Sequence, residues 1–276
     1  MNTNFQKIIK KIKGKKNQGI SNEFVFKILE NYLQNDFYKQ LFQKDEKLIL
    51  RNKHFKKLVK EIRKDLYKSY GIYQSNKINR MPKLLENLKS TSNLNGIKEI
   101  SKDILKLHTS SRERLDEYDI LYSEIFKLKP KIIIDLACGL NPCSLILANF
   151  KGKCFAYDIG KEIEYLNLYF NIISKHGISG EAFLQNINLD FKFKKGDMCF
   201  LFKYLDLVKD RVNFLNNLIN NLDCKYLIAS FSKKTISLKN MNNPERKWFV
   251  NFLRKKCLNY KILDFENEVF YIIKLK

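Results

Sequence analysis

The sequence predicts an α/β fold with a doubly wound sheet, preceded by a helical region. Three observations predict it. Short apolar runs rich in β-branched residues alternate with amphipathic stretches after His108. One such run, Ile132–Ile134, is apolar throughout and leads into Asp135, as a buried parallel strand does. The last two strand-like segments are joined by a three-residue turn, which predicts an antiparallel pair at the end of the chain.

The first part of the chain is expected to be helical. Residues 22–42 and 48–70 each place apolar side chains at the spacing of one helix face. Residues 71–95 are rich in Asn and Ser, so we expect a turn and a short helix in a looser connection. A further helix is expected over residues 97–107. These elements predict a helical domain over residues 1–107.

The second part, residues 108–276, is expected to form the α/β domain. Five strands are predicted before the closing pair, at residues 132–134, 155–157, 183–184, 198–202 and 226–231. Helices are predicted between them, at residues 162–175, 204–221 and 244–258. The closing strands are predicted at residues 260–265 and 269–274, with residues 266–268 as the turn.

The net charge of +23, from 52 basic and 29 acidic residues, indicates a polyanionic partner such as nucleic acid or an anionic membrane. A second explanation stays open. Lys outnumbers Arg by 44 to 8, and such a skew can arise from the codons of an AT-rich genome. Residues 1–107 hold 25 basic and 10 acidic side chains, and this concentration favours a true electrostatic surface.

The sequence argues against a membrane-spanning protein, a secreted protein and a zinc-binding protein. No apolar run approaches the ~20 residues that a membrane span needs. The first 16 residues lack the apolar core of a secretory signal. The six cysteines form no C-x-x-C pair, which indicates reduced thiols and argues against a zinc site. We therefore expect a cytoplasmic protein with no metal and no membrane partner.

The segment Asp135–Pro142, Asp-Leu-Ala-Cys-Gly-Leu-Asn-Pro, follows the first predicted strand, where ligands bind in open α/β sheets. Gly139 allows close backbone approach there. Asp158 ends the next strand, 23 residues after Asp135, where an acidic residue holds a ribose diol in nucleotide-binding units. A single glycine does not make a pyrophosphate cradle. Adenosine without phosphate fits better, and together with the closing antiparallel pair this indicates S-adenosylmethionine (SAM). The alternative is that Asp135 only caps and Gly139 only turns.

Five segments, taken together and in this order, form a distinctive pattern. They are His108–Leu115 (H-x-S-S-x-E-R), Asp135–Pro142 (D-L-A-C-G-L-N-P), Ala156–Ile159 (A-Y-D-I), Phe200–Leu205 (F-L-F-K-x-L) and Ser230–Ser237 (S-F-S-K-K-x-x-S). The pattern resembles that of the aminoglycoside-resistance 16S rRNA methyltransferases (the Arm family), and the resemblance spans about residues 60–276. The resemblance implies a Rossmann-like class I SAM-dependent methyltransferase domain with an N-terminal all-α accessory domain.

The resemblance also implies a set of cofactor-binding residues. Arg114 would pair with the methionine carboxylate of SAM, and Asp158 would accept the ribose hydroxyls. Asn186 stands where the family often has Asp, and Arg211 where members can carry Gln. Tyr70 and His108 could instead be buried residues between the domains. The implied set is Tyr70, His108, Thr109, Ser110, Arg114, Ala137, Gly139, Asp158, Asn186, Ile187, Phe202 and Arg211.

The implied target is N7 of a guanine in the decoding A-site of 16S rRNA. This nitrogen has a lone pair and no proton to lose, so transfer needs alignment and no general base. Lys203 resembles the family's lysine beside the target base and is expected to position the flipped guanosine or its phosphate. Contacts with RNA are expected from Lys56, Lys60, Lys64, Lys203, Lys233 and Lys234, for which a plain solvated surface is the alternative.

The sequence thus predicts a SAM-dependent 16S rRNA (guanine-N7) methyltransferase that confers aminoglycoside resistance and acts as a monomer on the 30S ribosomal subunit. Two alternatives stay open. One is a methyltransferase of another rRNA base, such as an A-site adenine. The other is a ribosome-binding protein that keeps the fold without methyl transfer.

Overall fold

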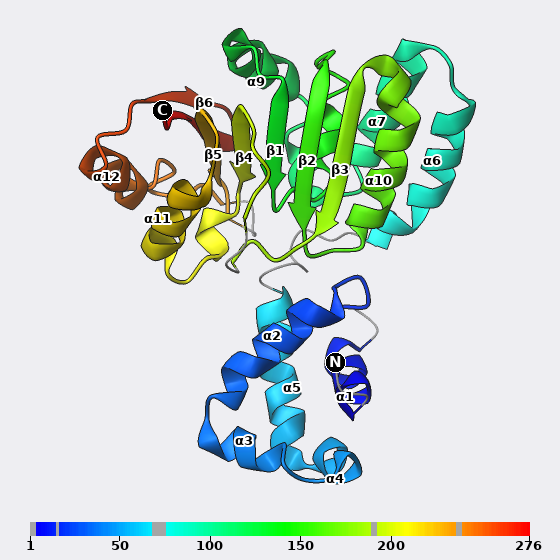
Figure 1. Cartoon of the computed structure of the whole chain (residues 1–276), viewed down its shortest axis with the longest axis vertical. Coiled ribbons are helices and arrows are strands. Elements are labelled where there is room, and N and C mark those ends of the chain that lie inside the picture. The colour runs from blue at the N-terminus through cyan, green and yellow to red at the C-terminus, as the bar shows by residue number, and fades with distance from the viewer. Residues whose placement is uncertain (1–3, 15–16, 68–75, 189–191, 236–238) are drawn as a thin grey trace. The chain divides into compact units, whose positions relative to one another are not determined.

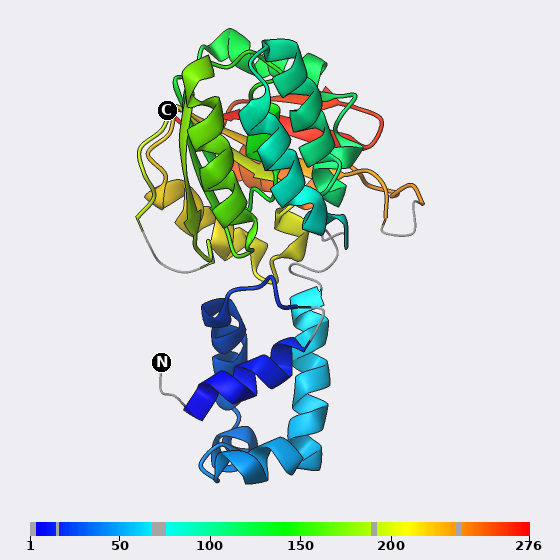
Figure 2. The same cartoon turned by 90° about the vertical axis from the view of Figure 1, so that its right-hand side faces the viewer.

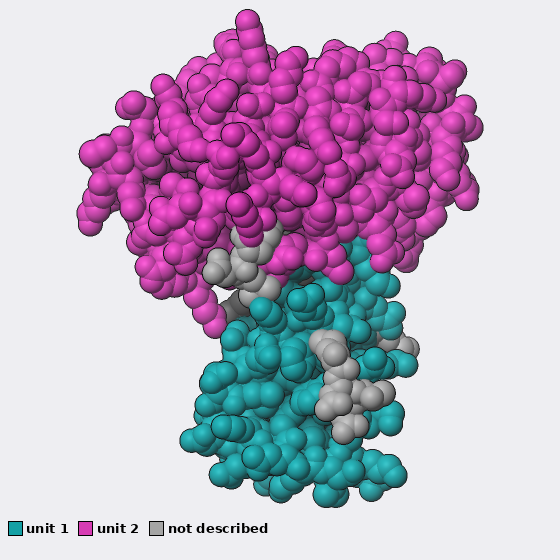
Figure 3. All heavy atoms as spheres, in the orientation of Figure 1, with its two compact units in different colours: residues 1–73, 159–161 teal, residues 74–158, 162–276 magenta. Residues whose placement is uncertain are grey.

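The computed structural model divides into two compact units, coloured separately in Figure 3. It describes residues 4–14, 17–67, 76–188, 192–235 and 239–276. Unit 1 comprises residues 1–73 and 159–161, and unit 2 comprises residues 74–158 and 162–276.

Unit 1 is a group of short helices. They are α1 (Asn4–Lys13), α2 (Asn22–Leu33), α3 (Asp36–Leu41), α4 (Glu46–Arg51) and α5 (Lys53–Leu66). Each of the two long helices predicted here is split by an asparagine. The Asn35 side chain accepts a hydrogen bond from the backbone N–H of Phe37 at the start of α3. The Asn52 side chain accepts one from the backbone N–H of His54 at the start of α5. An asparagine side chain that captures a backbone donor favours a helix start over a helix interior.

The core of unit 1 joins α1 to α5. Ile9 and Ile12 of α1 are buried together with Phe55 and Ile62 of α5. The Arg63 guanidinium donates to the carbonyl oxygens of Lys11 and Ile12 (2.8 Å each), which satisfies acceptors at the C-terminal end of α1.

A short segment from elsewhere in the chain completes unit 1. Ile20 forms an antiparallel bridge with Gly160, and the Ser21 amide donates to the Ile159 carbonyl oxygen at 3.2 Å. The Lys161 amide donates to the Gly19 carbonyl oxygen at 3.0 Å. Residues 159–161 follow directly on Asp158 in the sequence.

Unit 2 contains a seven-stranded sheet in the order β3-β2-β1-β4-β5-β7-β6 (Figure 1). The strands are β1 (Ile132–Leu136), β2 (Gly152–Asp158), β3 (Ile178–Leu184), β4 (Met198–Phe202), β5 (Tyr226–Ser232), β6 (Tyr260–Asp264) and β7 (Glu268–Lys274). The first five strands are parallel, and β7 is antiparallel to both β5 and β6. The doubly wound fold and the closing antiparallel pair are therefore confirmed.

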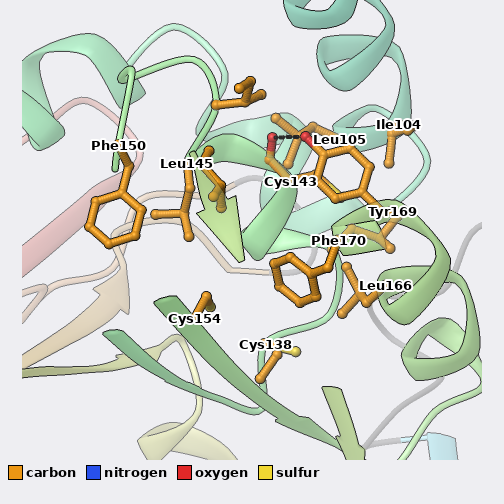
Figure 4. Packing of buried hydrophobic residues seen from close by; sticks show 14 of the residues in the cluster. Ile104, Leu105, Cys138, Cys143, Leu145, Phe150, Cys154, Leu166, Tyr169 and Phe170 are labelled. Atoms are coloured by element: carbon orange, nitrogen blue, oxygen red, sulfur yellow. Dashed lines mark hydrogen bonds between the residues drawn. The ribbon is translucent and has the colours of Figure 1, made fainter. Parts of the chain in front are cut away.

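Helices cover both faces of this sheet. One face packs against α6 (Met81–Ser90), α7 (Leu94–Leu105), α9 (Tyr118–Ile125) and α10 (Glu162–Ile173). Figures 1 and 2 show α6, α7 and α10 gathered on that side. The other face packs against α11 (Arg211–Asn221) and α12 (Lys247–Lys255). The first of these cores includes Leu105, Cys143 and Tyr169, whose hydroxyl donates to the Cys143 carbonyl oxygen (Figure 4).

Short helical turns connect the remaining elements. They are η2 (Asn76–Arg80), α8 (Thr109–Glu113), η3 (Phe126–Leu128), η4 (Asn141–Ser144), η5 (Ser174–His176) and η6 (Leu205–Leu207). The segment after β1 forms only the short turn η4. The helix predicted over residues 204–221 begins at Arg211, where the Asp210 side chain accepts the N–H of Asn213. Among the described residues, no helix is long and apolar enough to cross a membrane.

The boundary between the compact units falls between residues 73 and 74, whereas the sequence placed it at residue 107. The difference comes from α6 and α7. Leu85 and Leu88 of α6 and Ile104 of α7 are buried in the core that also contains Ile133 of β1 and Phe170 of α10. These two helices are amphipathic like those of unit 1, so sequence pattern cannot tell which core their apolar faces join.

Candidate active site

The loop after β1 is shaped by two residues with left-handed backbone. Ala137 and Gly139 both have φ +51°. The Gly139 amide donates to Oδ2 of Asp158, at the end of β2, over 2.7 Å. A Cβ added at Gly139 would lie 2.7 Å from Cε1 of His108. The left-handed backbone therefore favours glycine at position 139, and the imidazole packed on it leaves no room for a Cβ. The structure thus brings Gly139, Asp158 and His108 together, with Ala137 in the same loop, and their roles in cofactor binding stay predictions.

A buried amide follows this loop. Asp135 is buried, and burial raises the pKa of its carboxyl group to about 8. Its Oδ2 accepts from Nδ2 of Asn141 at 2.7 Å. This fixes the Asn141 amide so that its Oδ1 faces two donors, Oη of Tyr118 at 2.8 Å and Nη1 of Arg114 at 3.0 Å. Asn141 therefore links the β1 loop to the Arg114 side chain.

Arg114 is buried, with 1% of its side chain exposed, and its N–H groups are engaged within the chain. Nε and Nη2 donate to the two carboxylate oxygens of Glu268 at 3.1 and 2.9 Å. Nη2 also donates to Oγ of Ser110 at 3.2 Å, and Nη1 to Asn141 and to Oη of Tyr118 at 3.0 and 3.4 Å. A carboxylate ligand, as predicted for Arg114, would have to replace one of these acceptors.

Phe202, the last residue of β4, lies against this guanidinium. The Arg114 Cζ is 4.6 Å from the centroid of the Phe202 ring, within cation–π distance. The same ring stacks on Phe200 with centroids 4.9 Å apart and meets Phe270 edge to face. Phe202 is therefore part of the wall around Arg114, which is compatible with a place beside a methionine chain.

Lys203 has a strained backbone and a buried ammonium group. Its φ is +55°, and its amide donates to the carbonyl oxygen and Oγ of Ser230, each at 3.1 Å. Its Nζ lies 2.7 Å from Oε2 of Glu113 and 3.1 Å from Oε2 of Glu268. Only 4% of the side chain is exposed. The ammonium group is thus held between two carboxylates.

Glu268 is the acceptor that Arg114 and Lys203 share, and its carboxylate also accepts from the hydroxyl of Ser230. Burial would raise the pKa of Glu268, but the two cations outweigh burial and hold that pKa below its usual value. Conversely, burial would lower the pKa of Arg114, and Glu268 raises it instead. The Arg114–Glu268 pair is therefore charged.

The sequence prediction for Glu268 was wrong. It placed this residue in the turn, whereas Glu268 is the first residue of β7 and is paired in register with Ser232, the last residue of β5. A usable signal existed. Because β7 runs antiparallel to β5, an acidic residue that opens β7 lies at the edge where β5 ends, which is the ligand edge of the sheet. Glu113, Tyr118 and Asn141 were also missed.

The predicted residues beside the adenine lie in a turn after β3. Oδ1 of Asn186 accepts the backbone N–H of Asn188 at 3.0 Å, and Ile187 is buried in the apolar core that includes Tyr157 and Phe193. Arg211 opens α11, where its guanidinium lies 4.5 Å from the centroid of the Trp248 ring. This contact ties Arg211 to α12, and no contact described for it joins it to the Arg114 cluster. Tyr70 lies outside the described residues.

The lysines predicted to contact RNA differ from one another. Lys56, Lys60 and Lys64 are exposed on α5, on the side away from its buried apolar residues. Lys233, by contrast, pairs with Asp264 at 2.8 Å and donates to the Phe265 carbonyl oxygen. Lys234 lies 3.1 Å from Oε1 of Glu266. Phosphate would have to compete with the turn between β6 and β7 for these two lysines.

The arrangement as a whole has a defined chemical capacity. The ends of β1 and β2 offer a carboxylate and close backbone for a nucleoside. Beside the ends of β4 and β5, the start of β7 and the end of α8 bring two carboxylates, Glu268 and Glu113, to two buried cations, Arg114 and Lys203. Within the part of the chain that the structure describes, no group of three or more His, Cys, Asp or Glu side chains could hold a metal ion.

Comparison with known proteins gives a consistent result. Residues 45–250 match the model of the family described as ribosomal RNA methyltransferase (FmrO). A 16S rRNA (guanine(1405)-N(7))-methyltransferase from Proteus mirabilis is 28% identical over 239 residues, which cover 79% of this chain and 84% of the relative.

Solved structures resemble the chain over nearly its whole length. The 16S rRNA methylase RmtB superposes with a TM-score of 0.69 at 21% identity, and 99% of each chain is covered. The 16S rRNA methyltransferase RmtF, solved in complex with S-adenosyl-L-homocysteine, superposes with a TM-score of 0.73 at 18% identity, again with 99% of each chain covered. At these identities the likeness establishes the shared fold.

Proposed function

Because the chain belongs to the ribosomal RNA methyltransferase (FmrO) family, we propose that it transfers the methyl group of SAM to N7 of a guanine in the decoding A-site of 16S rRNA. Family membership makes the protein an enzyme that uses SAM to methylate rRNA, and it confirms the resemblance seen in the sequence motifs. The choice of guanine N7 follows the name of the relative from Proteus mirabilis.

The observation that carries the proposal is the end of β2, where the Asp158 carboxylate meets the backbone of the β1 loop. A carboxylate in this position can accept both ribose hydroxyls of SAM. The cofactor would be lined by the His108 imidazole and by Thr109 and Ser110 at the start of α8. The backbone of Ala137 and Gly139 would line it as well. Arg114 would meet the methionine end, provided that the cofactor carboxylate takes over a hydrogen bond now made within the chain.

Sulfonium chemistry explains why alignment suffices. When SAM is bound, it supplies an activated methyl group that needs only a nucleophile in line with the carbon–sulfur bond. Guanine N7 offers an in-plane lone pair and loses no proton on methylation. The chain's task is then to orient the base, with Lys203 as the proposed positioning residue, and to exclude misaligned approaches.

The exposed lysines of α5 supply the proposed contact with folded rRNA. Phosphate contacts from Lys56, Lys60 and Lys64 would help to offset the cost of turning the target nucleotide out of its stack, roughly a few kcal/mol. The substrate would be the 30S subunit, which the enzyme meets in the cytoplasm. A methyl group at this guanine would hinder aminoglycosides at the decoding site, so we propose that expression confers resistance.

The proposal is tested by incubating the purified protein with tritiated SAM and 30S subunits and locating the label by primer extension and mass mapping. Label at N7 of an A-site guanine is expected. Asp158→Ala should weaken SAM binding by at least about 10-fold in calorimetry, because it removes charge-assisted hydrogen bonds to the ribose. Asp119→Ala, which changes an exposed aspartate on α9, is the control.

Two results would contradict the proposal. Label on an adenine would favour a methyltransferase of another rRNA base. SAM binding without transfer to any ribosomal substrate would indicate a protein that binds ribosomes without modifying them. Unchanged SAM affinity in Asp158→Ala would remove the ribose role from this carboxylate.

A further inference from the structure

The four charged side chains of the cluster formed by Lys203, Arg114, Glu113 and Glu268 differ sharply in exposure. The side chains of Arg114, Lys203 and Glu268 are 1%, 4% and 1% exposed, whereas that of Glu113 is 37% exposed. Glu113 lies at the end of α8, and its Oε2 is 2.7 Å from Nζ of Lys203. Of this cluster, Glu113 is therefore the member that an incoming nucleotide can reach.

This exposure changes the expected partner. A phosphate approaching Lys203 would meet the carboxylate of Glu113 first and would be repelled. A carboxylate accepts hydrogen bonds and donates none while it is ionised. The chemistry at the exposed end of the cluster therefore favours a neutral base edge that presents N–H donors.

Guanine offers such an edge. Its N1–H and N2–H groups are two adjacent donors on the Watson–Crick side, and a carboxylate can accept both at once. Adenine presents an acceptor at N1 beside its amino group, so the same carboxylate would face a lone pair. N7 lies on the opposite side of the purine, so a base held at its Watson–Crick edge keeps N7 free for methylation.

We infer that Glu113 is a specificity-determining residue that binds the Watson–Crick edge of the target guanine, and that Lys203 and Glu268 hold Glu113 in place. This inference rests on the proposed function. It assigns Lys203 an indirect role, because its ammonium group positions a carboxylate and does not itself contact the nucleotide.

The same carboxylate would assist the transfer step. The N7 lone pair forms the new N–C bond, the C–S bond breaks, and its electron pair stays on sulfur, which becomes a neutral thioether. No proton moves, and the guanine ring gains one positive charge. That charge makes N1–H and N2–H stronger donors, so their bonds to Glu113 strengthen as the reaction proceeds.

The test pairs a protein change with a base change. Glu113→Gln and wild type are compared on 30S subunits reconstituted with either guanosine or inosine at the target position, since inosine lacks the N2 amino group. With wild type, inosine should lower kcat/KM by about 10-fold or more, the loss expected for one hydrogen bond to a charged group. Glu113→Gln should lower kcat/KM on guanosine by roughly 10- to 100-fold. For this variant, replacing guanosine with inosine should lower kcat/KM by a further factor of less than about 3. Glu99→Gln, a change of an exposed glutamate on α7, is the control.

Three outcomes are decisive. Non-additive losses with SAM affinity unchanged support the inference. If inosine lowers kcat/KM by the same factor in both proteins, Glu113 acts only on Lys203 and the inference fails. Failure of wild type to label guanine N7 at all would instead overturn the proposed function, so the two failures are distinguishable.

Discussion

Lysines on α5 in unit 1 and Lys203 in unit 2 occupy opposite environments. Lys56, Lys60 and Lys64 lie exposed along one helix, whereas Lys203 is buried between Glu113 and Glu268. The composition of the units follows the same division. Unit 1 holds 19 basic and 7 acidic residues, and the much larger unit 2 holds 33 and 22. Excess charge is thus densest in unit 1, whereas the candidate active site is built from residues of unit 2.

The exposed lysines can attract a polyanion, whereas the buried lysine can position the side chains around it. Exposed cations attract a polyanion at a distance, and salt weakens this attraction. A buried cation that already has two carboxylate partners adds little to long-range attraction, but it fixes those partners in place. The net charge of +23 therefore reflects mainly the exposed cations and says little about the groups in the candidate active site.

The largest expected effect tests the buried side of this comparison. Glu268→Gln leaves Arg114 and Lys203 buried without their shared carboxylate, so we expect the free energy of unfolding to fall by about 3–5 kcal/mol. Glu266→Gln changes an exposed glutamate two residues earlier and should cost less than about 1 kcal/mol. Chemical denaturation measures both. Equal small losses would mean that the buried cluster contributes nothing specific.

The next effect tests the exposed side. Replacing Lys56, Lys60 and Lys64 together with Gln should lower affinity for 30S subunits by about 10-fold at low salt. The slope of log affinity against log salt should become shallower by roughly 0.7–0.9 for each phosphate that is no longer neutralised. The rate at saturating 30S should not change. Filter binding across a salt series measures this, with Lys102, Lys106 and Lys127 changed to Gln in unit 2 as the control. Equal losses in both triple variants would contradict a docking role for α5.

The smallest expected effect concerns His108. Burial, followed by the nearby charges of Arg114 and Lys203, lowers the pKa of His108 to about 4. The unfolded chain, with a histidine pKa near 6.5, then binds a proton that the folded chain does not, so stability falls as pH drops through this window. Between pH 7 and pH 5.5 the free energy of unfolding should fall by about 1 kcal/mol more in wild type than in His108→Asn. Parallel pH curves for the two proteins would show that His108 is not buried beside cations.

Sequence alone predicted the sheet well because its signals are local. Four apolar runs and the closing pair are each legible within a few residues, and the loop with Gly139 and Asp158 follows from where those strands end. The exception is β3, which is only partly buried and was predicted at just its last two residues. The helical part was harder. Asn35 and Asn52 start new helices inside apolar patterns that continue across them, and α6 and α7 share their pattern with helices of the other unit.

The cluster around Lys203 could be predicted only in part. Arg114 and Lys203 were identified from motifs, but their carboxylate partners were not. Glu113 is 90 residues from Lys203 in the sequence, and Glu268 is 154 residues from Arg114. An acidic residue in a polar stretch is usually solvated, and only the antiparallel register of β7 with β5 shows that Glu268 faces inward.

Residues 159–161 have a consequence for engineering. Because these three residues belong to unit 1 although they lie within the sequence of unit 2, the chain passes from one unit to the other at three places. A deletion that starts the protein at Gln74 would strip Ile159 and Gly160 of the backbone partners supplied by Ser21 and Ile20, immediately after the carboxylate of Asp158. Chimaeras that exchange unit 1 between relatives should therefore transplant this tripeptide together with the amino-terminal helices.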